Sequence, residues 1–118
     1  MSTKPPEIWT SDPQARALRV EVSSERSLLV PFNQFNFSEL TSDGKGQCLR
    51  LVFATHEIVV RGYALRRVEA AMQRMELSFI SKVPVRYRAL FGDGQPFILE
   101  ILVTEAEPAG QPPLHSAS

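Results

Sequence analysis

The sequence contains one cysteine, two histidines and no net charge, and each of these limits the chemistry open to it. As the only cysteine, Cys48 cannot form an intramolecular disulfide, which fits a reducing compartment. One cysteine and two distant histidines cannot supply the four ligands of a structural zinc site, so no metal is expected. A net charge of zero provides no overall field to draw the chain onto nucleic acid or an anionic membrane.

Targeting signals and long apolar runs are also absent. The N-terminal residues include neither the apolar core nor the small-residue cleavage site of a signal peptide. The apolar run Phe97–Val103 is far shorter than the ~20 residues that cross a bilayer, and it contains Glu100. We therefore expect a soluble, cytoplasmic protein without a membrane segment.

Motifs for catalysis or cofactor binding are missing as well. His56 and Glu57 could carry out general acid–base chemistry, but neighbours in a strand point to opposite faces. Cys48 opens an apolar strand, where small buried cysteines are common. No serine lies in a Gly-x-Ser-x-Gly elbow, and turn chemistry explains Asp43–Gly46 and Gly92–Gly94. The sequence predicts no catalytic residue, no cofactor and no enzyme.

What the chain does contain is a series of short segments in which apolar and polar residues alternate, as in half-buried strands. Five such strands are expected in the first half, around Leu18–Val22, Ser27–Phe32, Phe35–Phe37, Cys48–Ala54 and Glu57–Arg61. The last two follow one another closely and are expected to form a hairpin.

After Gly62 the apolar residues are spaced three and four apart, which predicts an amphipathic helix over about 64–77. The residues on its apolar face are Leu65, Val68, Met72, Met75 and Phe79. A further strand is expected over 83–87, where Val83, Val85 and Tyr87 alternate with basic residues. The nearly all-apolar segment Phe97–Thr104 predicts a last strand in a central position, covered on both faces.

Hairpin-linked strands around one helix predict an α+β fold. We expect a mainly antiparallel curved sheet, or a partly open barrel, of about six to seven strands with one amphipathic helix. One globular domain is expected over 17–104, between an N-terminal arm over 1–16 and a disordered C-terminal tail over 105–118. Trp9, on the arm, is expected to dock either on its own domain or on a neighbour as part of an interface.

Basic residues concentrate in one segment although the whole chain is neutral. Residues 61–88 include seven basic and two acidic side chains, a net charge of +5 that the rest of the chain balances with −5. Arginine with aromatic residues is suited to phosphate contact and base stacking, and equally to protein interfaces. The candidate contact residues for a nucleic acid or a protein partner are Arg61, Arg66, Arg67, Arg86, Arg88 and Tyr87.

One short segment resembles a known family. The run Ile58-Val-Val-Arg-Gly62 is similar to the isoleucine-rich Arg-Gly segment in the second motif of Sm-like RNA-binding barrels. This resemblance implies that Arg61 contacts RNA. The first Sm motif, with its glycine and aspartate spacing, has no counterpart here, and a helix is predicted where that fold has its final strand. The family is therefore not assigned.

The sequence contains no motif in which polar residues would act together in catalysis. Together with surplus apolar surface, this favours a non-enzymatic protein-association module that forms a homo-oligomer. The surplus consists of Ile98 and Leu102 on the second face of the last strand, Trp9 on the arm, and the phenylalanines near Pro31.

Two other functions remain open. Nucleic-acid binding through the arginines is the alternative, less favoured because the chain as a whole is not basic. A small-ligand pocket or enzyme is the third, and it requires a cleft that joins His56 with Tyr63 or Tyr87 and with Glu100 or Asp93.

Overall fold

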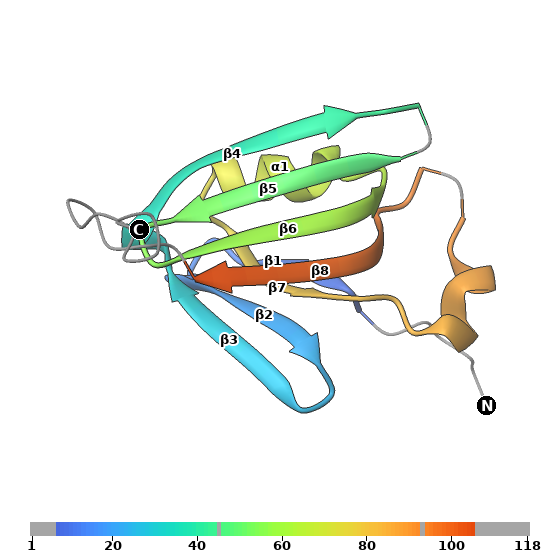
Figure 1. Ribbon diagram of the computed structural model, residues 1–118, viewed down its shortest axis with the longest axis horizontal. Helices are drawn as coiled ribbons and strands as arrows, with labels where there is room; N and C mark the ends of the chain where they lie inside the picture. Colours follow the sequence, from blue (N-terminus) through green and yellow to red (C-terminus); the bar gives the residue numbers. More distant parts are fainter. Residues whose placement is uncertain (1–6, 45, 93, 106–118) are drawn as a thin grey trace, which may run out of the picture.

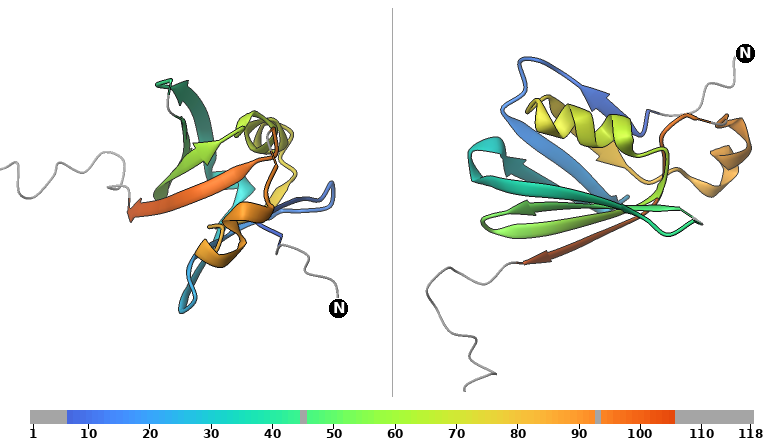
Figure 2. Two further views of the ribbon diagram at one scale, coloured as in Figure 1. Left: turned by 90° about the vertical axis from the view of Figure 1, so that its right-hand side faces the viewer. Right: turned by 90° about the horizontal axis from the view of Figure 1, so that it is seen from above.

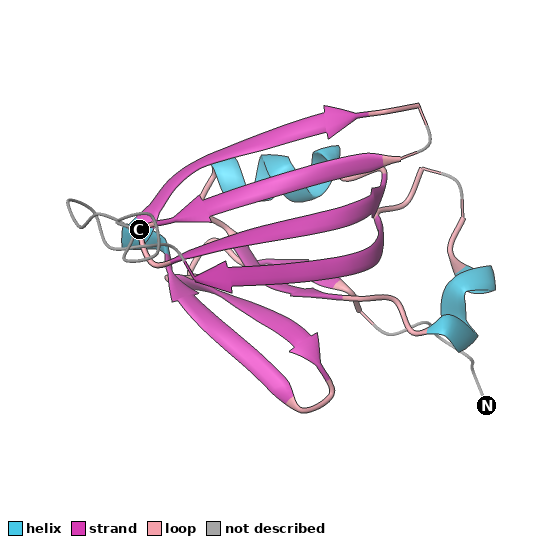
Figure 3. Ribbon diagram, in the orientation of Figure 1, coloured by secondary structure: helices cyan, strands magenta, loops and turns pink. Residues whose placement is uncertain are grey.

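Eight β-strands, one α-helix and two short 3₁₀-helices make up the part of this computed structural model that is described, residues 7–44, 46–92 and 94–105 (Figures 1 and 3). In chain order the elements are β1 (Trp9–Ser11), β2 (Ala17–Ser23), β3 (Arg26–Pro31), η1 (Phe32–Gln34), β4 (Phe35–Ser42), β5 (Gln47–Phe53), β6 (His56–Tyr63), α1 (Arg66–Gln73), β7 (Leu77–Ser81), η2 (Val85–Leu90) and β8 (Phe97–Glu105).

The strands form two four-stranded sheets. Sheet A has the order β1-β7-β2-β3 and sheet B the order β4-β5-β6-β8. Sheet B is antiparallel throughout, whereas sheet A contains one parallel pair, β2 with β7. The predicted α+β class with mainly antiparallel strands is confirmed. The finer prediction of one curved sheet or a partly open barrel is not, since the strands divide between two sheets and no barrel closes within the described residues.

The helix α1 lies in the angle between the two sheets (Figure 2). The sheets approach one another where β2 contacts β8, and α1 packs against β4 of sheet B and β7 of sheet A. Its Val68, Ala71 and Met72 are fully buried, as is Leu65 just before it. Burial of the three larger side chains, Leu65, Val68 and Met72, contributes roughly 1.5–3 kcal/mol each. The two sheets and the helix therefore share one core.

Local sequence signals place the hairpins correctly. The β5–β6 hairpin has the expected antiparallel register, with Leu51 opposite Ile58. The β2–β3 turn falls at Ser24 and Glu25, and the β4–β5 turn follows Asp43, whose backbone N–H donates to the carbonyl of Gly46 at 3.1 Å. Strand β1 was not predicted. It places Trp9 opposite Ile80 of β7 while Ile8 is buried, so this part of the arm docks on its own domain.

The predicted extent of the helix is wrong at its C-terminal end. Met75 adopts a left-handed conformation with φ of 58°, and the N–H of Met75 donates to Met72 while that of Glu76 donates to Ala71, both at 2.9 Å. This is the Schellman arrangement that ends a helix. The chain then continues as β7, so Phe79 lies in the strand between β1 and β2 rather than on the helix face.

Two predictions after the helix are also wrong. Residues 83–87 do not form a strand: after Pro84, with φ of −62°, the chain enters the 3₁₀-helix η2, and Val85 is 74% exposed. Strand β8 is not central but lies at the edge of sheet B. Its Ile98 is buried, whereas Leu102 on the opposite face is 46% exposed. The apolar sequence of β8 therefore covers the core on one side only.

Met75→Gly is expected to stabilise the protein by about 0.5–1 kcal/mol. In the left-handed conformation at the C-terminal end of α1, the Cβ atom of methionine is sterically strained, and glycine has no Cβ atom. Urea unfolding measures the difference. The matched control Gln73→Gly, two residues earlier inside α1, should lower stability by about 1 kcal/mol. If both variants lose stability equally, the left-handed helix end at Met75 is not the source of strain.

Candidate functional site

Sheet B buries one face and leaves the other uncovered. The alternating residues Leu49, Leu51, Ile58 and Val60 of β5 and β6 point into the core and are fully buried. The residues between them point to the opposite side, the outer face of sheet B. The helix and sheet A lie on the core side, and no other described element covers the outer face (Figure 2).

Apolar side chains cross this outer face from one edge strand to the other. Phe37 of β4 pairs with Val52 of β5, and Val59 of β6 pairs with Leu102 of β8. Because Val52 lies opposite Glu57, two residues from Val59, the two valines are diagonal neighbours. Phe37 is 50% and Leu102 46% exposed, while the two valines are half-buried. We call Phe37, Val52, Val59 and Leu102 the apolar diagonal.

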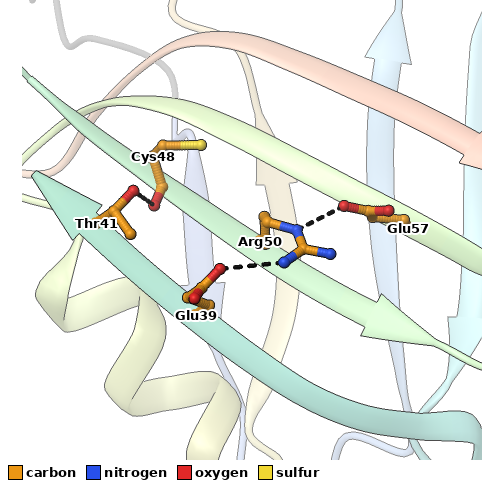
Figure 4. Close-up of polar contacts among 5 residues, drawn as sticks. All are labelled: Glu39, Thr41, Cys48, Arg50 and Glu57. Atoms are coloured by element: carbon orange, nitrogen blue, oxygen red, sulfur yellow. Dashed lines mark hydrogen bonds and ion pairs between the residues drawn. The ribbon is translucent and has the colours of Figure 1, made fainter.

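Charged side chains flank the apolar diagonal and are paired within the same face (Figure 4). The guanidinium of Arg50 donates from Nε to Glu57 Oε2 at 2.7 Å and from Nη1 to Glu39 Oε1 at 3.1 Å. These hydrogen bonds, that to Glu57 first, raise the pKa of Arg50 above its ordinary value. The same guanidinium lies 5.9 Å from the ring centre of Phe37. Arg50 thus links three strands.

The candidate arginines fall into two groups. Arg61 lies on the outer face of sheet B, where its Nε is 3.6 Å from Glu100 Oε1. Arg66 and Arg67 begin α1, and Arg86 and Arg88 lie in η2; these four are exposed and make no ion pair with any described residue. The N-terminus of α1 and η2 both face the end of the molecule shown in the left view of Figure 2. The fold thus gathers the unpaired arginines at one end.

The residues considered for catalysis do not come together. His56 and Tyr63 lie at opposite ends of β6, seven residues and about 23 Å apart. The His56 Nδ1 atom is 2.9 Å from the hydroxyl of Thr55, and Glu57 is paired with Arg50 instead. Asp93 lies outside the described residues. Among the residues that the structure describes, no cluster of three or more His, Cys, Asp or Glu side chains could hold a metal ion.

The sequence indicates Phe37 and Leu102 as surplus apolar residues, but it does not predict their alignment with Val52 and Val59 or the ion pairs beside them. Alternation along β5 and β6 does indicate that Arg50, Val52, Glu57 and Val59 share one face once their hairpin is assumed. The pairing of Val59 with Leu102 depends on β8 joining β6 across the intervening helix and β7, and no local signal specifies it.

Comparison of the chain with protein-family models, with curated proteins and with solved structures finds no match. In the described part of the chain, no helix is both long enough and apolar enough to cross a membrane.

Gly62, the glycine of the segment that resembles the Sm motif, has a local structural role. The register between β6 and β8 shifts at Arg61 and Gly62, and a Cβ atom on Gly62 would lie 1.8 Å from the carbonyl oxygen of Phe97. Only glycine allows the two backbones to approach this closely. This close approach explains the glycine of the Arg-Gly pair by packing of the two strands.

Gly62→Ala should therefore lower the free energy of unfolding by about 3 kcal/mol or more, because either β6 or β8 must shift to avoid the clash. Urea unfolding followed by circular dichroism measures this. Gly92→Ala is the control, since its Cβ would meet only the flexible side chain of Gln95 at 3.9 Å, and it should stay within about 0.5 kcal/mol of the parent protein. Equal stability of the two variants would contradict the close approach.

Proposed function

We propose that this protein is a non-enzymatic association module that forms a homodimer by packing the outer face of sheet B against the same face of a second copy. The observation that carries this proposal is the apolar diagonal on a face that no described element covers. Its lone cysteine, Cys48, fits a role in the reducing cytoplasm.

The apolar diagonal supports a symmetric interface because it crosses all four strands of sheet B. In a two-fold dimer each copy presents the same surface, so the apolar residues of one can lie on those of the other. Phe37 and Leu102 stand at the two ends of the diagonal and are about half exposed. Covering them removes apolar surface from water, which drives association.

The charges on the outer face favour this packing because each arginine already has an acidic partner in its own copy. Arg50 bonds to Glu39 and Glu57, and Arg61 lies beside Glu100. A charge that becomes buried without a partner costs several kcal/mol, whereas a hydrogen-bonded pair costs much less. The ion pairs beside the diagonal therefore lower the penalty for excluding water from the face.

The size of the face indicates a dimer of modest affinity. Four strands of seven to nine residues cover a plane of roughly 19 by 26 Å, or about 500 Å² in each copy. Two copies together bury about 1,000 Å², near the lower limit of specific interfaces. We expect a dissociation constant in the micromolar range, and an assembly that depends on concentration.

Leu102→Glu should abolish the dimer, because it places an unpaired carboxylate within the buried surface, at one end of the apolar diagonal. We expect its dissociation constant to rise at least about thirtyfold. Light scattering after gel filtration, over loading concentrations from about 1 µM to 1 mM, measures the molar mass of the full chain. The matched control is Leu29→Glu, an equal change at a 60% exposed leucine of β3 in sheet A, and it should remain dimeric.

A parent protein that stays monomeric up to about 1 mM would overturn the proposal. Loss of the dimer in Leu29→Glu but not in Leu102→Glu would move the interface to sheet A. Thermal unfolding of both variants, which should match the parent protein, shows that any loss of association is not loss of the fold.

A further inference from the structure

A groove runs across the end of the molecule that carries the unpaired arginines. One hollow of about 270 Å³ is lined by Trp9, Arg67, Phe91 and Gln95, among others. A second, of about 290 Å³, shares Phe91 and Gln95 with the first and continues to Tyr63. We call this the end groove. It is separate from the apolar diagonal on the outer face of sheet B.

Aromatic rings form the floor and walls of the end groove. The ring centres of Tyr63 and Phe97 are 6.0 Å apart, and those of Phe91 and Phe97 are 5.5 Å apart in an edge-to-face arrangement. Phe91 and Phe97 are half-buried against the core, whereas Tyr63 is 47% exposed. Tyr63 therefore presents a ring held by a rigid neighbour, on which a planar group can stack.

The two arginines that begin α1, of which Arg67 lines the end groove, are not explained by stability. Arg66 and Arg67 occupy the first turn of α1, where the helix dipole disfavours positive charge by about 0.3–1 kcal/mol. Arg86 and Arg88 lie in η2, and the carbonyl of Arg88 accepts the N–H of Phe91 in the groove wall. At the start of α1, positive charge that has no acidic partner among the described residues, and that the helix dipole disfavours, indicates a surface that meets an anion.

We propose that the end groove binds single-stranded nucleic acid, with bases on the aromatic rings and backbone phosphates on Arg66, Arg67, Arg86 and Arg88. Phosphate contact alone would suit any polyanion, but aromatic rings that line the same groove as Arg67, with Tyr63 47% exposed among them, suit alternating bases and phosphates. An acidic polypeptide has the charge and lacks the stacking groups. Glu7 lines the groove beside Trp9 and repels phosphates from that side.

The chain offers a direct readout of binding. Trp9 is its only tryptophan, and it lines the end groove, so a bound base should quench its fluorescence. Full-length protein is titrated with fifteen-residue oligo-dT and oligo-U, which distinguish DNA from RNA, and with poly-glutamate as an anion without bases. Anisotropy of labelled oligonucleotide gives the dissociation constant between about 50 and 200 mM NaCl.

Binding should weaken about fiftyfold over this salt range, since four phosphate contacts on a single strand give a slope near −2.8. The Arg66→Gln/Arg67→Gln double variant should halve this slope and weaken binding at low salt, while its melting temperature stays equal or rises. The control is Arg16→Gln/Arg74→Gln, which removes an exposed arginine just before β2 and another, paired with Glu76, at the C-terminal end of α1, and should leave binding unchanged.

Stacking is tested at Tyr63. Tyr63→Ala should weaken oligonucleotide binding about tenfold or more, while Tyr63→Phe, which keeps the ring, should bind as the parent protein does. Glu7→Gln should tighten binding because it removes the repulsive charge. Leu102→Glu should bind unchanged, so this proposal and self-association through sheet B can fail separately.

Three results would overturn the proposal. One is no fluorescence or anisotropy change with either oligonucleotide at about 50 mM NaCl. Another is equal loss of binding in both arginine double variants, which would show attraction to charge anywhere on the surface. The third is binding of poly-glutamate as tight as that of the oligonucleotides and unaffected by Tyr63→Ala, which would assign the groove to acidic polypeptides.

Discussion

Packing of α1 into the angle between the two sheets is the contact on which the rest of this structure depends. A helix of eight residues is not stable in water by itself, so α1 exists because Val68, Ala71 and Met72 are buried between β4 and β7. In turn the helix fills the space between the two sheets, which approach one another where β2 contacts β8. The helix and the two sheets therefore stabilise one another.

This arrangement decides which surfaces remain open. Because both sheets turn one face toward the helix, no described element covers the outer face of sheet B (Figure 2). That face carries the apolar diagonal beside the ion pairs of Arg50 (Figure 4). The helix also begins at the end of the molecule where η2 lies, which brings arginines from two distant segments together. The arginines on the outer face of sheet B form ion pairs, whereas those at the end form none with any described residue, and this difference separates the two proposed surfaces.

Several elements followed from local sequence. The β5–β6 hairpin formed as predicted because alternation fixes which side chains of Cys48–Arg61 face the core. The buried positions Leu65, Val68 and Met72 of the helix were also correct. The helix end was missed because Met75 takes the left-handed position where glycine is usual, and the spacing to Phe79 imitated one more turn.

The sequence alone determined the α+β class, the hairpins and the existence of one amphipathic helix, because each depends on residues close together in the chain. Only the tertiary structure decided that β7 inserts between β1 and β2, that β8 takes the edge beside β6, and that residues 85–90 form a 3₁₀-helix. The positions of these strands and the conformation of residues 85–90 depend on contacts between distant segments, which the hydrophobic periodicity of the sequence does not specify. The apolar diagonal and the end groove are products of such contacts, and for this reason neither could be found before the fold was known.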